Sequence, residues 1–132
     1  MEELMIVPFS EKYFSQIQEL NKQEGWNQLV ERYEETFNAW KNSNAAYVVI
    51  GPNEKIAGYI RCLTDMNVTI YVCEMLISEE FRGKGLGGKL LKHVHNLYPR
   101  TRMEMLASHT SHTFYESQNF RPFYGFRKTY EG

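Results

Sequence analysis

The sequence predicts an α/β (α+β) domain in which a mostly antiparallel sheet carries about four helices on its faces. Two observations predict this fold. Apolar runs with the period of a strand, separated by short turns, occupy residues 45–77. A glycine-rich segment follows and leads directly into residues with the spacing of an amphipathic helix. We expect a single domain over residues 1–132.

Composition and charge indicate a soluble globule with a small-molecule partner. Of the 132 residues 42% are hydrophobic and 14% are aromatic, which is enough for a folded core. Fifteen basic residues against sixteen acidic ones leave a net charge of −1, so no basic field favours nucleic acid. The start, Met1-Glu2-Glu3, does not resemble a signal peptide, and no apolar run reaches membrane-spanning length. We therefore expect a cytoplasmic protein without nucleic-acid or membrane partners.

The first third of the chain is expected to hold one strand and two helices. A short apolar run predicts a strand at 4–7. Helical spacing then predicts one helix over about 11–21, which Gly25 ends, and a second over about 27–42.

An antiparallel meander is predicted for the middle, with strands at 45–50, 56–63 and 68–77. If residues 64–67 turn a hairpin, Cys62 and Cys73 are offset by about four residues, or about 13 Å, which forbids a disulfide.

The last third alternates again between helix and strand. The spacing predicts a helix ending at about Leu97, a strand at 102–106 and a short helix at 111–118, followed by Asn119. Two apolar runs split by Gly125, at 120–124 and 126–130, predict a closing hairpin. Exposed closing strands could pair two copies into a homodimer.

The most informative segment is the glycine-rich one, in which Gly83, Gly85, Gly87 and Gly88 occupy four of six positions. A strand, a glycine-rich turn and a helix N-terminus together form a cradle for phosphate. Glycine lets a ligand approach the backbone, the first N–H groups of the helix are unpaired, and the helix dipole favours an anion.

Three phosphate-binding patterns compete for these residues. Gly83, Gly85 and Gly88 satisfy the dinucleotide pattern G-x-G-x-x-G, but only 44 residues remain after Gly88, too few for a doubly wound sheet. The segment also fits G-x-x-x-x-G-K, but Leu90 replaces the hydroxyl residue that holds magnesium. The third pattern is Arg or Gln, two residues, Gly, one residue, then Gly or Ala, which Arg82, Gly85 and Gly87 satisfy.

This third pattern, behind an apolar strand and a short acidic connector, resembles the acetyl-coenzyme A loop of the GNAT superfamily of N-acetyltransferases. The predicted order β-α-α-β-β-β-α-β-α-β-β is similar to the order of that family, so the resemblance covers nearly the whole chain. It implies a mixed sheet that is splayed between its fourth and fifth strands, here 68–77 and 101–107. It also implies acetyl-CoA as cosubstrate and no metal.

The resemblance also implies which residues bind the cosubstrate. The pantetheine arm would hydrogen-bond to the backbone of the fourth strand at Met75, Leu76 and Ile77. The phosphates would contact the loop and the first turn of the helix, namely Arg82, Gly83, Lys84, Gly85, Leu86, Gly87 and Gly88.

Tyr115 is the first candidate catalytic residue. The segment 113–120 resembles a late helix of the family in which a tyrosine lies beside the coenzyme A sulfur. A phenol with a pKa of about 10 is a suitable proton donor to a departing thiolate. The alternative is a core tyrosine whose hydroxyl is bonded to a backbone carbonyl.

Glu74 is the second candidate, as the group that deprotonates or holds the acceptor amine. Strand alternation would place it on one face with Ile70, Val72 and Leu76, where a carboxylate interrupts an apolar row. The resemblance implies that this strand often has a bulge here, which would turn Glu74 to the other face. Burying a charge without a partner is costly, so we expect it to meet water, a cation or a substrate ammonium. Glu104 on the neighbouring strand, or water, is the alternative base, and a purely structural role for Glu74 also stays open.

Trp26 lies between the first two predicted helices. It either packs this loop onto the core or, as the resemblance implies, lines the acceptor side of the site.

The prediction is thus an N-acetyltransferase that moves an acetyl group from acetyl-CoA to a primary amine, a small molecule or peptide, in a ternary complex. Two alternatives remain open: a non-catalytic acyl-CoA sensor domain and a nucleotide-binding module.

Overall fold

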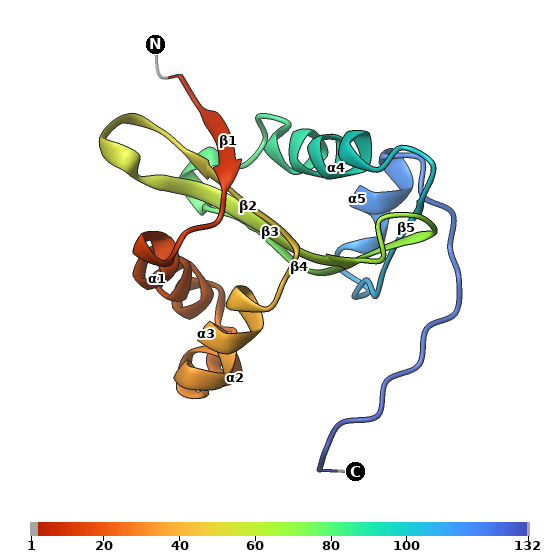
Figure 1. The fold of residues 1–132 in the computed structure, drawn as a ribbon, viewed down its shortest axis with the longest axis horizontal. Coiled ribbons are helices and arrows are strands. Elements are labelled where there is room, and N and C mark those ends of the chain that lie inside the picture. Colours follow the sequence, from red (N-terminus) through yellow and green to blue (C-terminus); the bar gives the residue numbers. More distant parts are fainter. Residues whose placement is uncertain (1–2, 132) are drawn as a thin grey trace.

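The structure, a computed structural model, describes residues 3–131 as a five-stranded sheet with helices on both faces (Figure 1). The strands lie in chain order: β1 (Met5–Pro8), β2 (Ala45–Ile50), β3 (Ile56–Thr64), β4 (Thr69–Ile77) and β5 (Arg102–Met105). The first four are antiparallel to their neighbours, whereas β5 runs parallel to β4. The predicted mixed, mostly antiparallel sheet is confirmed.

Helices α1 (Phe14–Glu24), α2 (Asn27–Glu31) and α3 (Tyr33–Lys41) cover one face, and α4 (Leu86–Leu97) and α5 (His112–Ser117) cover the other (Figure 1). Three short 3-10 turns, η1 (Glu11–Tyr13), η2 (Pro52–Glu54) and η3 (Glu79–Phe81), complete the order. None of the helices within residues 3–131 is long and apolar enough to cross a membrane.

The break after α1 is where the sequence places it, because Gly25 adopts a left-handed conformation with φ 83°. The single helix predicted over 27–42 is wrong: it divides at Arg32, whose ψ of 60° is not helical. At this break the carbonyl of Leu29 accepts hydrogen bonds from Gln18 Nε2 at 3.0 Å and from Thr36 Oγ1 at 2.7 Å. These two side-chain bonds stabilise a kink that helical periodicity does not reveal.

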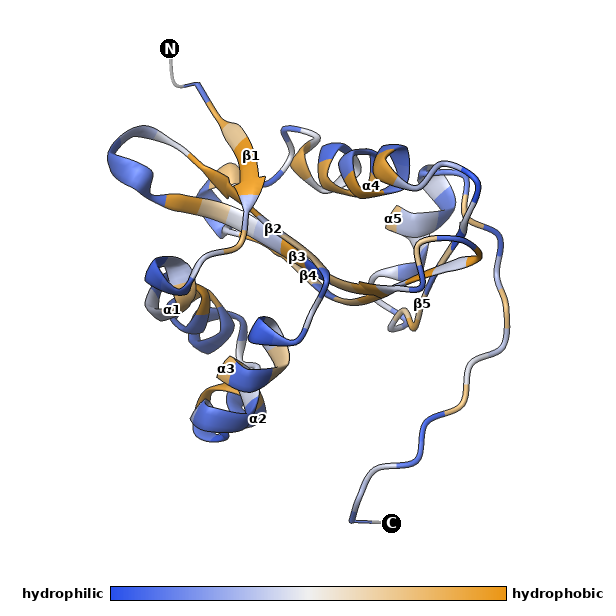
Figure 2. Cartoon of the chain, viewed as in Figure 1, coloured by the Kyte–Doolittle hydropathy of each residue, from blue (hydrophilic) through white to orange (hydrophobic). Residues whose placement is uncertain are grey.

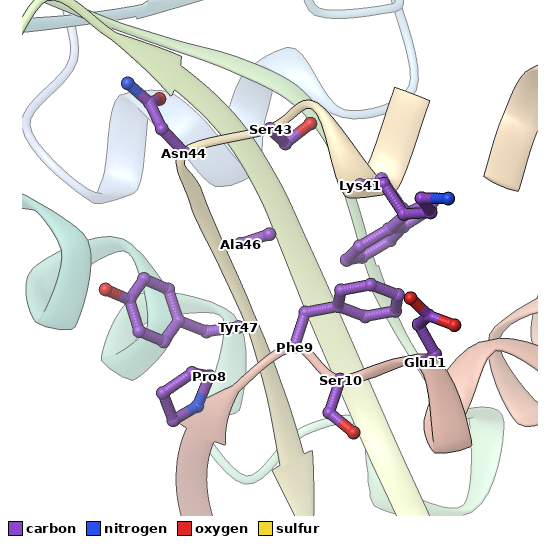
Figure 3. A pocket seen from close by; sticks show the side chains of 10 residues that line it. Pro8, Phe9, Ser10, Glu11, Lys41, Ser43, Asn44, Ala46 and Tyr47 are labelled. Atoms are coloured by element: carbon purple, nitrogen blue, oxygen red, sulfur yellow. The ribbon is translucent and has the colours of Figure 1, made fainter. Parts of the chain in front are cut away.

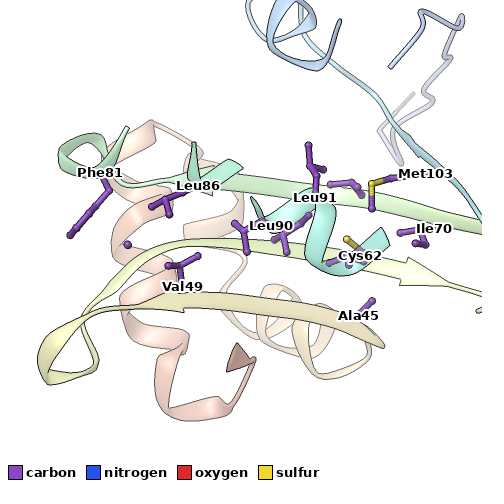
Figure 4. Packing of buried hydrophobic residues seen from close by; sticks show 13 residues of the cluster. Ala45, Val49, Cys62, Ile70, Phe81, Leu86, Leu90, Leu91 and Met103 are labelled. Atoms are coloured by element: carbon purple, nitrogen blue, oxygen red, sulfur yellow. The ribbon is translucent and has the colours of Figure 1, made fainter. Parts of the chain in front are cut away.

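Each face of the sheet has its own apolar cluster. On the α4 side, Ile60, Ile70, Leu90 and Val94 are fully buried, and Figure 4 shows α4 packed on the strands through this cluster. The cluster on the α1–α3 side is built around four residues that are at most 1% exposed: Ile17, Trp40, Val48 and Tyr59. Figure 2 shows the same division, with hydrophobic residues along the strands and hydrophilic ones on the outer sides of α1 and α3.

A bulge in β4 changes the expected side-chain pattern. Arg61 pairs with Glu74 but Cys62 pairs with Val72, so Cys73 is an extra residue in β4. Ile70 and Val72 pack in the α4-side cluster, whereas Leu76 packs on the α1–α3 side. The expectation that Glu74 shares a face with Ile70 and Val72 is therefore wrong, because the bulge flips the alternation.

The bulge also corrects the expected cysteine offset. Cys62 pairs with Val72 rather than with a residue near Thr69, so it lies close to the bulged Cys73. Both cysteines are free thiols, and burial raises the pKa of Cys62 to about 12.

The closing hairpin predicted at 120–124 and 126–130 is wrong. No strand forms between residues 120 and 131, and every residue from 121 to 131 is exposed. Pro122 has no N–H to donate to a ladder. Gly125 passes so close to Leu106 that a Cβ there would lie 2.1 Å from Leu106 Cδ2. The segment 120–131, called the tail below, runs away from α5 as an extended chain (Figure 1).

Candidate active site

A cleft opens where β4 extends past the end of β5. The two strands pair only from Thr69 to Val72 on β4 and from Arg102 to Met105 on β5, so residues 73–77 of β4 have no partner on that side. This is the predicted splay between the fourth and fifth strands. A cavity of about 880 Å³ lies beside residues 73–77.

The cavity brings together most of the residues singled out from the sequence. Its walls include Glu74, Met75, Leu76, Ile77, Arg82, Gly83, Gly85, Leu86, Gly87 and Tyr115. Strand β4, the glycine-rich segment and α5 therefore converge on one space, although they are separated in the chain. A free edge of β4 offers backbone N–H and C=O groups to any extended ligand that enters.

The glycine-rich segment has an open, left-handed backbone. Gly83 and Gly85 have φ values of 79° and 78°, and a Cβ at either position would meet nothing within 4 Å. Gly85 is the N-cap of α4, and no side chain of residues 3–131 caps this helix. Since the first N–H groups of a helix have no partner within it, those of α4 are available to an anion.

Gly87 has a different role, in close packing. A Cβ there would lie 2.9 Å from Phe114 Cζ and 3.4 Å from Met75 Cε. The absence of a side chain therefore lets α4 approach α5 and the end of β4.

Two predicted phosphate ligands do not line the cavity. The Nζ of Lys84 lies 5.3 Å from the centre of the Phe81 ring. Gly88 is buried against Gln118, whose Oε1 would lie 2.7 Å from a Cβ at that position. Arg82 does line it, and its Nε donates to the carbonyl of Ile77 at 2.9 Å.

Arg82 also ties the loop to the end of α1. Its Nη2 lies 2.6 Å from Glu24 Oε1, and the two side chains are 48% and 35% exposed. Glu24, which sequence reasoning missed, lines the same cavity. No sequence signal could have found this pair, because the partners are 58 residues apart.

Glu74 is held by a bidentate ion pair. Arg61 Nε and Nη2 donate to its two carboxylate oxygens at 2.8 and 2.7 Å, and Arg61 Nη1 donates to Ser43 Oγ at 3.1 Å. The side chains of Arg61 and Glu74 are only 14% and 19% exposed. The cation that we expected beside Glu74 is therefore an arginine of the neighbouring strand, which fixes the orientation of the carboxylate.

Glu104, the alternative base, lies elsewhere. It pairs with Tyr71 in the β4–β5 register, and its Oε2 is 3.7 Å from Arg102 Nε. It lines an adjoining pocket between β5, α5 and the tail, which shares Met105, Leu106 and Tyr115 with the cleft, and it does not line the cleft itself. Glu74 is thus the one of the two carboxylates that the cleft can use directly.

Tyr115 faces the cleft from α5, with its ring 5.1 Å from that of Phe114 and 5.8 Å from that of Phe120. Burial raises its pKa above the ordinary value, so the phenol keeps its proton at neutral pH. Within residues 3–131 no group hydrogen-bonds to its hydroxyl. The alternative of a core tyrosine bonded to a carbonyl is therefore wrong.

The remaining wall was only partly foreseen. Trp26 packs at the edge of the α1–α3-side cluster and also lines the cleft. Leu29 of α2, Leu106 and the tail residue Arg127 join it. No hydrophobic period or motif marks these three residues as part of a site. They meet only because the fold brings together segments that are far apart in the sequence.

A second hollow, of about 580 Å³, lies near the start of β2 and the end of α3 (Figure 3). Phe9 and Trp40 both line it, with ring centroids 4.8 Å apart. None of the candidate residues lines it, so we assign it no part in the chemistry. Among residues 3–131 no group of three or more His, Cys, Asp or Glu side chains is arranged to hold a metal ion.

Comparison with known proteins agrees with this geometry. A family model described as an acetyltransferase (GNAT) domain matches residues 43–122. No curated protein matches the chain.

Three solved structures illustrate the similarity of fold. A GNAT family acetyltransferase from Streptococcus pneumoniae TIGR4 aligns with a TM-score of 0.79 and 16% identity, covering 100% of both chains. An aminoglycoside acetyltransferase from an uncultured soil metagenomic sample, in complex with trehalose, has a TM-score of 0.67 and 16% identity, covering 97% of this chain and 95% of that one. An acetyltransferase from Trypanosoma brucei has a TM-score of 0.67 and 16% identity, covering 96% and 99%. At identities this low the likeness shows the fold alone.

Proposed function

Since the chain belongs to the GNAT acetyltransferase family, we propose that it is an acetyl-CoA-dependent N-acetyltransferase that transfers the acetyl group directly to a primary amine. The observation that carries this proposal is a single cleft that unites the amides at the start of α4, the free edge of β4, Glu74 and Tyr115. A site that only binds coenzyme A would need the amides and the strand edge, but not Glu74 or Tyr115.

The residues present fit acetyl-CoA. The left-handed Gly83 and Gly85 leave space around the backbone, and the uncapped N-terminus of α4 offers N–H groups for a diphosphate. The unpaired edge at Met75 and Ile77 suits an amide-bearing arm that adds to the sheet like a strand. Arg82, whose charge Glu24 compensates, lines the cavity beside the loop and offers guanidinium N–H donors.

When bound, the thioester supplies the activated acetyl group. Backbone N–H groups on the free edge of β4 would stabilise the negative charge that develops on its carbonyl oxygen. Glu74, oriented by Arg61, would accept the proton of the attacking amine, directly or through water. Tyr115, which keeps its proton because burial raises its pKa, would donate it to the departing sulfur. Holding amine and thioester in one cleft supplies much of the acceleration through proximity.

Two measurements test the proposal. Calorimetric titration should show acetyl-CoA binding more tightly than NAD or ATP, and a screen of primary amines should release the coenzyme A thiol. Coenzyme A binding without turnover of any amine would indicate a sensor domain. Tighter binding of NAD or ATP would indicate a nucleotide-binding module.

Gly85→Glu tests the cradle itself. The substitution places a side chain on a backbone with φ 78° and puts a carboxylate where the phosphates bind, so acetyl-CoA binding should fall below detection. Gly85→Gln is the matched control, because it has the same size and backbone strain without the charge. Equal acetyl-CoA affinities for Gly85→Glu and the wild type would contradict a phosphate cradle at this turn.

A further inference from the structure

The charges that line the cleft are unevenly compensated. Four charged side chains line it: Glu24, Glu74, Arg82 and Arg127. Arg82 and Glu24 form one ion pair, and Glu74 is neutralised by Arg61. Arg127 forms no ion pair, hydrogen bond or ring contact with any residue of the described range 3–131. The cleft therefore carries one uncompensated positive charge, and the tail supplies it.

The tail holds Arg127 at the end of the cleft that is remote from the glycine-rich loop. Gly125 packs against Leu106, just past the end of β5. The guanidinium carbon of Arg32, between α2 and α3, lies 5.2 Å from the centre of the Tyr130 ring. In Figure 1 the tail accordingly runs from α5 toward the side of the sheet that carries α1–α3, away from the N-terminus of α4.

Arg127 thus lies toward the end of the cleft lined by Leu106 and by Leu29 of α2, because Gly125 packs on Leu106 and Tyr130 packs on Arg32. If the proposed function is right, the phosphates of acetyl-CoA are held at the other end, by the amides of the loop and by Arg82. The amine must then enter where Arg127 lies.

From this arrangement we infer that the acceptor is a small primary amine that also carries an acidic group, a carboxylate or a phosphate, and that Arg127 binds this group. The inference rests on the proposed function and adds a substrate class to it. A guanidinium is suited to both groups because its N–H fork matches their oxygens. Trp26 and Leu29 would cover the apolar part of the acceptor between its two polar ends.

The test uses matched pairs of acceptors that differ only in the acidic group. These are β-alanine with β-alaninamide, and phosphoethanolamine with ethanolamine. Binding to the coenzyme A-saturated protein is measured by calorimetry, and thiol release from acetyl-CoA is measured with rates referred to the concentration of free amine. One acidic member should bind about tenfold or more tightly than its neutral partner, and the two pairs decide between carboxylate and phosphate.

Arg127→Gln should remove this preference and leave the affinity for acetyl-CoA unchanged. Lys128→Gln is the matched control: it removes the same charge from the neighbouring residue, which does not line the cleft, and should leave the preference intact. Equal binding of both members of both pairs to the wild type would overturn the inference. So would weaker acetyl-CoA binding by Arg127→Gln, because Arg127 would then contact the cosubstrate.

The two proposals fail differently. If no amine releases thiol although acetyl-CoA binds, the transferase proposal is wrong, and the calorimetric preference for acidic amines still decides the role of Arg127. If neutral amines are acetylated as well as acidic ones and Arg127→Gln changes nothing, the transferase proposal stands and the acidic acceptor is wrong.

Discussion

Glu74 and Arg61 form the most enclosed ion pair in the described part of the chain, at the bulge where the cleft begins. Glu74→Gln removes the charge but keeps the shape. We expect it to lower the free energy of unfolding by about 2 kcal/mol, since a largely buried guanidinium loses its counter-ion. We also expect a lower rate of acetyl transfer and a changed pH–rate profile, because the group that accepts the proton is lost.

Denaturant unfolding and a pH–rate profile separate these two effects. A structural role alone would change stability and leave the pH dependence of the rate as it is in the wild type. An unchanged pH dependence would indicate that water, rather than Glu74, accepts the proton of the amine, since Glu104 lies outside the cleft. Arg61→Lys is the companion variant, because it keeps the charge on Glu74's partner but loses the bidentate geometry.

Tyr115 provides the second prediction at this scale. Tyr115→Phe should lower kcat about 100-fold, the low end of general acid catalysis because a thiolate leaves readily, and should leave the affinity for coenzyme A unchanged. The protonated phenol is the active form, so activity is lost as pH rises through its pKa. Because burial raises that pKa, the alkaline limb of the wild-type rate should lie above about pH 10 and be absent from the variant. An unchanged kcat would remove the acid role.

At the scale of elements, the site depends on how closely α4 and α5 approach. Gly87→Ala would place a methyl group 2.9 Å from Phe114 Cζ and 3.4 Å from Met75 Cε, and both of these side chains line the cleft. Phe114 must move. We expect acetyl-CoA to bind about tenfold more weakly, corresponding to about 1.4 kcal/mol. Calorimetry measures the affinity, and thermal unfolding shows whether the fold survives.

Gly88→Ala is the control within the same helical turn. Its methyl group would meet only the terminal amide of Gln118, which can swing aside, and alanine is favoured over glycine in a helix by about 1 kcal/mol. We expect this variant to be as stable as the wild type or slightly more stable, with normal acetyl-CoA binding. Equal loss of affinity in both variants would mean that phosphate contact, rather than the packing of α4 on α5, requires these glycines.

At the scale of the whole molecule, the tail is the conspicuous anomaly. Phe123, Tyr124, Phe126 and Tyr130 are 76%, 96%, 93% and 81% exposed, and β5 has only one neighbour in the sheet. Exposed aromatic groups beside an unpaired strand edge favour association between chains. We therefore expect a self-associating protein whose apparent mass rises with concentration in sedimentation experiments.

The variant Tyr124→Ser with Phe126→Ser keeps Arg127 and the backbone but removes two of these rings. It should stay monomeric at concentrations where the wild type associates, and its free energy of unfolding should change by less than about 1 kcal/mol because both rings are exposed. A wild type that is monomeric at every concentration would contradict this prediction.

Local patterns predicted the parts of the fold that local physics decides. Alternation located β2, β3 and β4, a left-handed glycine ended α1, and the amphipathic spacing after the glycine-rich loop located α4. In each case the residues that determine the element lie within it or directly next to it in the sequence. The kink at Arg32 escaped prediction, since it depends on contacts with other elements. The bulge in β4 was an alternative that only the resemblance implied, and the structure has it at Cys73.

The sequence by itself determined the family, the glycine-rich turn before α4 and the direction of β4, because glycine and strand alternation act through the backbone of a few adjacent residues. Only the tertiary structure decided that Arg61 holds Glu74, that Glu24 holds Arg82 and that Arg127 enters the cleft. These contacts join residues far apart in the chain, and Coulomb attraction and burial depend on distance in space rather than on distance along the sequence. The tail depends on tertiary contacts in the same way. Its sequence has the pattern of two strands, but a strand forms only beside a partner strand, and within residues 3–131 the tail pairs with none.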